Sequence, residues 1–285
     1  MKGGAVRALV TGATGFVGSR LIPHLLDQDY EVVAAMRSRE DASSRHWGGR
    51  FEVVEMDAES AEHVAKTLQD IDAAYYLLHS MAGSDFAEKD REMAKSFARA
   101  AADAGVQRIV YLGGLAPETD NVSEHLASRL EVEEELMKSG VPVVVAVRAG
   151  ILIGGGSTSF ELVRRLVERM PVIPLPAFMN ARLTPISISD ALKVLISALT
   201  DPTSYMVINA VGSESLSYAN LVRTYAQVAG VKRILCQCHP SRTPGSAALL
   251  VLFRVCPMLW CMRWCRAWER NSWRMPTSPG TFSIR

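Results

Sequence analysis

Three glycines at a three-residue spacing have the clearest chemical meaning in this chain. They are Gly12, Gly15 and Gly18 of the stretch TGATGFVG, between a strand-length apolar segment (5–10) and residues 19–26, which are apolar at helical spacing. On a strand-to-helix turn such glycines allow a tight turn, close approach of the backbone to a pyrophosphate and tight helix packing. The free N–H groups and positive dipole end of the helix also favour phosphate. This pattern predicts a dinucleotide-binding turn; the alternative is an ordinary turn between a strand and a helix.

A second informative position follows the next predicted strand, residues 31–36. In dinucleotide-binding folds, an acidic residue about 20 residues past the glycines binds the ribose 2′-hydroxyl and repels a 2′-phosphate. Here Met36 is followed by Arg37 and Ser38, and the first acid is Glu40. A guanidinium suits a phosphate, and a serine hydroxyl can add a hydrogen bond. We predict NADP rather than NAD as the cofactor; the alternative is a solvated arginine without a ligand.

Two further polar residues follow the third and fourth predicted strands, 51–56 and 73–78. Asp57 is placed either to accept a hydrogen bond from the adenine amine or to cap the helix that begins near Ser60. His79 leaves the fourth strand where the ribose and nicotinamide are expected, and a ligand contact and a structural role are both open for it.

The elements that must position these residues alternate regularly along the first half of the chain. Apolar periodicity predicts helices over 85–104 and 124–138, and strands over 108–112 and 141–147. The last of these strands is a nearly unbroken valine run, which is typical of parallel strands buried on both faces. The predicted fold is therefore α/β, a doubly wound parallel sheet of Rossmann type.

Beyond Gly150 the pattern of the chain changes. The glycine run 154–156 predicts a loop, and three prolines after it divide the chain into extended pieces. Helices are predicted over 160–170, from Ser189 or Asp190 to Leu199, and over 217–228, with strands over 181–188 and 206–210. We expect a dinucleotide-binding core over 1–150 and a smaller substrate lobe over 151–235.

The motifs together resemble the short-chain dehydrogenase/reductase superfamily, and within it the extended and atypical branches, the NmrA-like and nucleoside-diphosphate-sugar-epimerase-like proteins. The resemblance spans about residues 5–235. It rests on TGATGFVG (11–18), Arg37, Asp57, IVYLGGL (109–115), RAGILIGGGS (148–157) and LTPISISDAL (183–192). Together with the turn and strand-end arguments above, it predicts these cofactor contacts: Thr11, Gly12, Thr14, Gly15, Phe16, Val17, Gly18, Arg37, Ser38, Asp57, Leu78, His79 and Gly113.

The catalytic residues of that superfamily are not present here in their usual form. The family places a Ser or Thr after the fifth strand and Tyr-x-x-x-Lys on the next helix, where the tyrosine moves a proton and the lysine lowers its pKa. This chain has Gly113-Gly114 at the first place and His125 and Arg129 at the second. Histidine can shuttle protons and arginine can hold ribose or phosphate, so these two are the catalytic candidates. The alternative is that both belong to a binder without catalysis.

The composition of the whole chain excludes some classes of function. The formal net charge of +1 over 285 residues gives no electrostatic reason to expect nucleic acid binding. The N-terminus leads directly into the first strand without a signal peptide, so a cytoplasmic location is expected. No metal site is expected, since the cysteines lack a partner set with zinc spacing.

The last fifty residues depart from the rest in composition. All five cysteines and four of the five tryptophans lie in 236–285, where Glu269 is the only acid. The apolar stretch 247–262 is interrupted and shorter than the ~20 residues of a membrane span. We interpret this tail as poorly ordered or translated out of frame; an interfacial membrane anchor is the alternative.

Two functions follow from these residues. The first is an NADP-dependent oxidoreductase or isomerase acting on a small carbonyl or hydroxyl compound. The second is a non-catalytic NADP(H)-binding redox sensor that acts through a regulatory protein partner. The missing serine and tyrosine favour the sensor, whereas the full set of cofactor motifs and the substrate lobe favour the enzyme.

Overall fold

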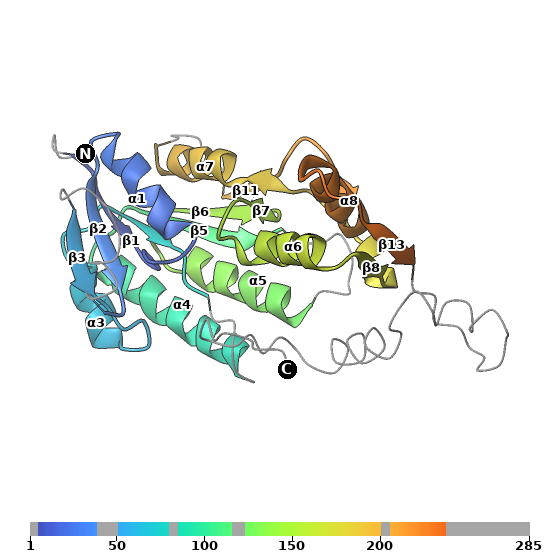
Figure 1. Cartoon of the computed structure of the whole chain (residues 1–285). Helices are drawn as coiled ribbons and strands as arrows, with labels where there is room; N and C mark the ends of the chain where they lie inside the picture. The colour runs from blue at the N-terminus through green and yellow to red at the C-terminus, as the bar shows by residue number, and fades with distance from the viewer. Residues whose placement is uncertain (1–4, 39–50, 80–84, 116–122, 201–205, 238–285) are drawn as a thin grey trace, which may run out of the picture. The chain divides into compact units, whose positions relative to one another are not determined.

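The computed structural model describes residues 5–38, 51–79, 85–115, 123–200 and 206–237 (Figure 1). The chain divides into two compact units. The first contains residues 1–161 and 183–215, and the second contains residues 162–182 and 216–285.

A seven-stranded parallel sheet forms the centre of the first unit. Its strand order is β11-β6-β5-β4-β1-β2-β3, and this order reverses between β1 and β4, which is the point where doubly wound sheets bind dinucleotides. The predicted doubly wound sheet is thereby confirmed. The strands are β1 (Arg7–Val10), β2 (Glu31–Met36), β3 (Glu52–Glu55), β4 (Ala73–Tyr76), β5 (Arg108–Gly114), β6 (Val143–Ala149) and β11 (Val207–Ala210).

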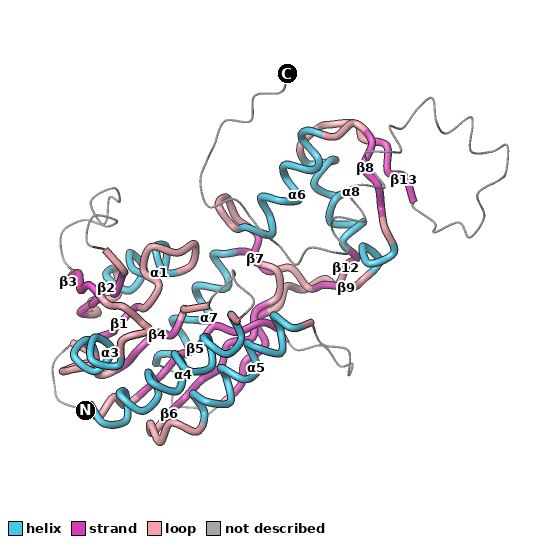
Figure 2. The backbone as a smooth tube through the Cα atoms, turned by 90° about the horizontal axis from the view of Figure 1, so that it is seen from below, coloured by secondary structure: helices cyan, strands magenta, loops and turns pink. Residues whose placement is uncertain are grey.

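Helices cover both faces of this sheet (Figure 1). Alternate residues of the central strands therefore enter different cores: Leu9 of β1 packs with α4 and α5, whereas Val10 packs with α1 and α7. On one face lie α1 (Gly18–Leu26) and α7 (Ile188–Thr200), and on the other lie α3 (Ala61–Thr67), α4 (Phe86–Asp103) and α5 (Glu124–Met137). Figure 2 shows α4 and α5 side by side, a contact that brings the candidate His125 of α5 onto Phe86 of α4.

Local sequence signals account for most element ends. Gly105 and Gly140 follow α4 and α5 with φ of +76° and +83°, the left-handed conformation that ends helices and suits glycine. The predicted ends differ from the observed ones by a few residues at most. One correction concerns α7, which begins at Ile188, because the Ser187 hydroxyl accepts a hydrogen bond from Asp190 N–H at 3.1 Å and so caps the helix.

The segment 206–210 belongs to the central sheet, although the sequence suggested the smaller lobe. As β11 it pairs in parallel with β6, from Val207 opposite Ala146 to Ala210 opposite Ala149. The segment 181–188, predicted as one strand, instead contains two short ones, β9 (Arg182–Leu183) and β10 (Ile186–Ser187). The latter pairs with β7 (Leu152–Ile153). Of the residues in the predicted lobe 151–235, 162–182 and 216–235 lie in the second unit, whereas 151–161 and 183–215 lie in the first.

The second unit contains two longer helices and a two-stranded parallel pair. The helix α6 (Thr158–Arg169) begins in the first unit and continues into the second. The other elements are β8 (Val172–Leu175), the 3-10 helix η1 (Ala177–Asn180), β12 (Leu216–Ser217), α8 (Tyr218–Val228) and β13 (Ile234–Gln237). The tail predicted to start at residue 236 overlaps β13, where Cys236 pairs with Pro174. The rest of that tail, 238–285, lies outside the described residues.

No helix within the described ranges is both long enough and apolar enough to span a bilayer.

Thr11 joins the two strands at the reversal point of the sheet. Its side chain is fully buried, and its hydroxyl donates to Tyr75 O at 2.9 Å and accepts from Leu77 N–H at 3.0 Å. Its own N–H also donates to Tyr75 O, at 3.1 Å. The Thr11 side chain therefore holds the exit of β4 against the end of β1.

We predict that Thr11→Val destabilises the protein by about 1–3 kcal/mol, because valine fills the same space but leaves the Leu77 N–H without its acceptor. Thr11→Ser retains the hydroxyl and is the matched control. Urea denaturation of the three proteins measures the difference. Equal stability of Thr11→Val and the parent protein would show that this hydroxyl is not needed.

Candidate cofactor and active site

The glycine turn after β1 is closely packed. Gly12 has a φ of +61°, and its carbonyl accepts from Gly15 N–H at 2.9 Å. A Cβ added to Gly18 would lie 2.5 Å from Gly12 O, which is shorter than any tolerated contact. Gly12 thus allows the turn, and Gly18 allows α1 to approach it.

The turn lies between the exits of β2 and β4. A Cβ on Gly12 would meet Leu77 O at 3.2 Å and the Leu78 side chain at 3.6 Å. On the other side, Ala13 N–H donates to Ala35 O of β2 at 3.3 Å. The predicted contacts Gly12, Leu78 and Arg37 therefore come from three adjoining segments of one sheet edge.

The start of α1 offers backbone donors for an anion. The N–H groups of Ser19, Arg20 and Leu21 donate to carbonyls of the turn, at Gly15 and Val17. Within the described ranges, no backbone carbonyl accepts from the N–H groups of Phe16, Val17 or Gly18. Donors of this kind at a helix N-terminus fit a diphosphate.

The remaining predicted contacts of the adenosine half lie after β2 and β3. Arg37 is exposed and Ser38 is half-buried, directly behind β2. Asp57 is exposed and its carboxylate accepts from Glu59 N–H at 3.0 Å. The suggestion that Asp57 caps α3 is wrong, because Ser60 occupies the cap position and accepts from His63 N–H at 3.4 Å. A contact between Asp57 and adenine remains a prediction.

The glycines Gly113 and Gly114 form the last residues of β5 and pair with Arg148 and Ala149 of β6. A Cβ on Gly113 would lie 2.9 Å from Cε1 of Tyr111, and one on Gly114 would lie 2.9 Å from the Leu126 side chain. The Tyr111 hydroxyl donates to Arg129 O at 3.0 Å, which holds the ring in place. The Tyr111 ring thus fills the space beside Gly113, near the place where the short-chain dehydrogenase/reductase superfamily has a Ser or Thr.

The two catalytic candidates lie one turn apart on α5. The His125 ring stacks on Phe86 of α4, with ring centres 4.5 Å apart and planes 27° apart. The Cδ of Arg129 would be 3.4 Å from a Cβ on Gly114, so its side chain runs along the end of β5. Because α5 follows β5 in the chain, its first turns lie at the carboxyl edge of the sheet, where the predicted cofactor contacts also lie.

His79 has an altered protonation equilibrium at the same edge. The residue is exposed on one side, but the protein that surrounds its ring lowers the pKa of His79, and the positive charge of Arg129 lowers it further. The charge of Asp90 and a hydrogen bond to the backbone of Leu77 act in the opposite direction. The net effect favours a neutral imidazole near neutral pH, which can accept a proton or a hydrogen bond.

Two structural features of the site were not predicted. Arg148 of β6 and Glu133 of α5 form a two-pronged ion pair, with N–O distances of 3.0 and 2.6 Å. The hydrogen bonds to Glu133 raise the pKa of Arg148. An arginine within a buried valine strand is the sequence signal that a partner is needed. The second feature is Arg20, which donates to the carbonyls of both Phe16 and Gly155.

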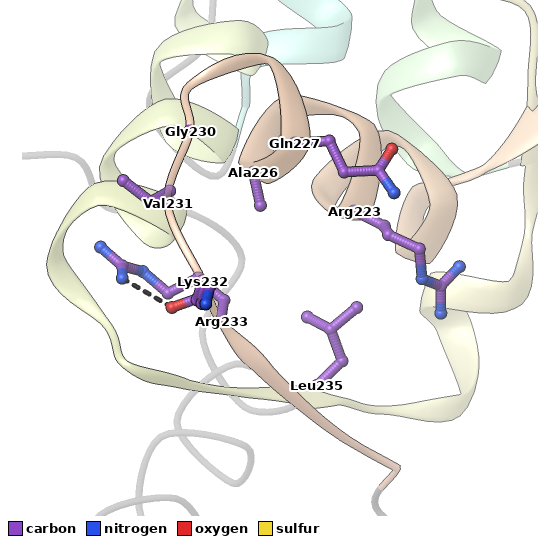
Figure 3. Close-up of a pocket in the computed structure, with 8 residues that line it drawn as sticks. All are labelled: Arg223, Ala226, Gln227, Gly230, Val231, Lys232, Arg233 and Leu235. Atoms are coloured by element: carbon purple, nitrogen blue, oxygen red, sulfur yellow. Dashed lines mark hydrogen bonds between the residues drawn. The ribbon is translucent and has the colours of Figure 1, made fainter.

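The second unit contains a hollow of about 420 Å³ at the end of α8 (Figure 3). Its lining includes Arg223, Lys232 and Arg233, but the Arg233 guanidinium is already bonded to Val167 O, Glu168 O and Lys232 O. None of the predicted site residues lines it. In the described part of the chain no three His, Cys, Asp or Glu side chains gather as a metal site would require. The glycine turn and the sheet edge beside it are therefore the candidate site.

Comparison with known families agrees with this geometry. Residues 12–172, more than half of the chain, match the sequence profile of a family described as NAD(P)H-binding. The chain belongs to this NAD(P)H-binding family. The match begins at Gly12 and includes the turn and β5, so the dinucleotide-binding assignment of the first unit is confirmed.

Similar proteins include two kinds of curated relative. UDP-glucose 4-epimerase of Vibrio cholerae is 25% identical over 250 residues, which cover 76% of this chain and 74% of the relative. The mitochondrial NADH dehydrogenase (ubiquinone) 1 alpha subcomplex subunit 9 of Arabidopsis thaliana is 23% identical over 208 residues, which cover 70% of this chain and 51% of the relative. This NAD(P)H-binding chain thus spans only about half the length of the subunit 9 relative.

Solved structures with the same fold include two bacterial enzymes. The Bordetella bronchiseptica enzyme WbmG, solved in complex with NAD, gives a TM-score of 0.69 at 19% identity, over 85% of this chain and 83% of that one. UDP-N-acetylglucosamine 4-epimerase from Bacillus cereus gives 0.66 at 19% identity, over 82% and 86%. These likenesses establish the fold.

We predict that replacing Arg129 by Met raises the pKa of His79, because the variant removes a positive charge that disfavours the imidazolium. The Arg129 carbonyl that accepts from Tyr111 is unaffected by this change. Following the ring proton signals of His79 by NMR across a pH titration measures the shift. Arg99→Met, on the exposed side of α4, is the control. An unchanged His79 titration in Arg129→Met would show that the two side chains do not interact.

Proposed function

We propose that this protein is an NADP(H)-dependent oxidoreductase or isomerase that acts on a small carbonyl or hydroxyl compound. The observation that carries the proposal is the position of Arg37, directly behind the strand on which the glycine turn rests. The turn donates from Ala13 N–H to Ala35 O, and Arg37 follows two residues later in the chain. An arginine here lies next to the place where the adenosine ribose is expected.

The charge at this position favours a phosphorylated ribose. β2 ends at Met36 and is followed by Arg37 and Ser38, and the first acidic residue after the strand is Glu40. An acid would bind the 2′-hydroxyl through a hydrogen bond, whereas a guanidinium forms charge-assisted hydrogen bonds to a phosphate. The match to the NAD(P)H-binding family and the structure of WbmG with NAD support a nicotinamide cofactor. The choice of NADP over NAD rests on Arg37 and Ser38 of this chain.

A nicotinamide cofactor, when bound, supplies or accepts the hydride. In the proposed reaction His125 gives a proton to the substrate oxygen in the reducing direction and takes one in the oxidising direction. Its stacking on Phe86 fixes the plane of the imidazole. Arg129, one turn further along α5, places a permanent positive charge at the end of β5, where it can hold a ribose hydroxyl or a developing oxyanion.

A non-catalytic NADP(H) sensor is the second candidate function. Tyr111 favours it, because its ring fills the space beside Gly113 that a catalytic hydroxyl would need. No tyrosine stands at the place held by His125, and an arginine cannot tune a tyrosine as a lysine does. A sensor would bind the cofactor without turnover and pass the redox state on to a protein partner.

We predict that the protein binds NADPH and NADP more tightly than NADH and NAD in calorimetric titration. In Arg37→Ala the dissociation constant for NADPH should rise about tenfold or more, since a charge-assisted hydrogen bond to the 2′-phosphate is lost. Binding of NADH should stay unchanged, and Arg99→Ala should behave as the parent protein. Tighter binding of NADH than of NADPH by the parent protein would refute the NADP assignment.

We predict that NADPH oxidation with a panel of small aldehydes and ketones falls about 100-fold in His125→Ala, the usual loss when a general acid is removed. The dissociation constant for NADPH should not change, and the exposed His24→Ala is the control variant. The absorbance of NADPH reports turnover. Tight NADPH binding by the parent protein without turnover on any member of the panel would favour the sensor.

A further inference from the structure

A second glycine loop, Gly154 to Ser157, lies against the dinucleotide turn. The connection is made by Arg20, in the first turn of α1. One guanidinium nitrogen of Arg20 donates to Phe16 O at 2.8 Å, and another donates to Gly155 O at 2.7 Å. The guanidinium carbon lies 4.4 Å from the centre of the Phe16 ring. One side chain thus links the loop after β7 to the turn after β1.

The glycine loop is shaped to fit against Phe16. A Cβ on Gly154 would lie 2.8 Å from the Ile188 side chain and 3.2 Å from Cζ of Phe16. By contrast, a Cβ on Gly155 would meet nothing within 4 Å. Gly156 has a φ of +90° and passes within reach of Arg20 and Phe16. The loop therefore needs a glycine at 154 for contact and at 156 for conformation, while position 155 tolerates a side chain.

Hydrogen bonds to nearby residues also hold the shape of the loop. The buried Ser157 hydroxyl donates to Leu152 O at 2.8 Å, and Ser157 N–H donates to Gly154 O at 3.0 Å. Gly156 N–H donates to the Glu161 carboxylate at 3.3 Å. These bonds give the loop a defined shape but do not attach it to the turn. The attachment is made by Arg20 and by the packing of Gly154 on Phe16.

We propose that Arg20 is a positioning residue for the cofactor, which clips the loop 154–157 beside the turn so that the loop contacts the nicotinamide half of the dinucleotide. This inference rests on the dinucleotide site of the proposed function. The adenosine half is expected over β2 and β3, on the far side of the reversal point from β6 and the loop that follows it. The clip therefore acts on one half of the cofactor only.

The chemistry of arginine suits this clip. A planar guanidinium can donate to two carbonyls at once while stacking on an aromatic ring, whereas a lysine ammonium is a point charge on a flexible stem. The two acceptors here are backbone oxygens of different loops, and Phe16 lies under the guanidinium. Lysine at position 20 would retain the charge and lose the simultaneous bonds.

The test compares a whole dinucleotide with its adenosine half. Calorimetry of Arg20→Met and Arg20→Lys should show NADPH bound about tenfold more weakly than by the parent protein, the change expected if the loop without its clip holds the binding position in about one tenth of the molecules. Adenosine 2′,5′-bisphosphate, which lacks the nicotinamide half, should bind all three proteins equally. Gly154→Ala should resemble Arg20→Met, and Arg99→Met, on the exposed side of α4, is the control that should bind NADPH as the parent protein does.

Three results would overturn the clip: unchanged NADPH affinity in Arg20→Met, full affinity in Arg20→Lys, which would assign the effect to charge alone, or an equal loss for the bisphosphate. If Arg20→Met does not fold, Gly154→Ala decides, and NADPH affinity of Gly154→Ala equal to that of the parent protein would contradict the proposal. Preference of the parent protein for NADH would instead refute the NADP assignment. The same comparison would then use NADH and AMP.

Discussion

The approach of α1 to the end of β1 is the constraint on which the rest of the site depends. It is possible only because Gly18 has no side chain, since a Cβ there would overlap Gly12 O. This approach brings the start of α1 to the sheet edge at the point where the strand order reverses. It also sets Phe16 and Arg20 above the turn, within reach of Gly155. The donors for a diphosphate and the second glycine loop are thus positioned by one close contact between backbones.

Some arginines at the sheet edge are bonded to other groups of the protein, and others are candidates to contact a ligand. Arg148 is neutralised by Glu133 and joins α5 to β6, so its role is to hold the helix at its place. Arg20 bonds to two carbonyls and stabilises loop geometry. Arg37 lies exposed behind β2. Arg129 lies along the end of β5, close enough to lower the pKa of His79. An edge of this composition suits a ligand with several phosphates, although the whole chain is almost neutral.

The sequence predicts the turn and the sheet because both depend on local signals. Glycine spacing, the valine run of β6 and the glycines that end α4 and α5 each act within a few residues. The sequence does not predict that β11 pairs with β6, because the residues of a four-residue strand do not specify which strand it pairs with. The cap at Ser60 in place of Asp57 depends on a choice between two good capping residues three apart. The stacking of His125 on Phe86 and the bond of Arg20 to Gly155 join residues far apart in sequence, so only packing reveals them.

The end of β5 sets how closely α5 packs against the sheet. Gly113 and Gly114 are fixed by neighbours on the helix side: Tyr111 covers the first, and Leu126 and Arg129 cover the second. A side chain on Gly114 would press against Leu126 and Arg129 of α5, and a side chain on Gly113 would press against the Tyr111 ring. The absence of side chains instead lets α5 pack closely, which places His125 and Arg129 at the sheet edge. The two glycines at the end of β5 and the place of His125 and Arg129 at the sheet edge therefore belong to one packing arrangement.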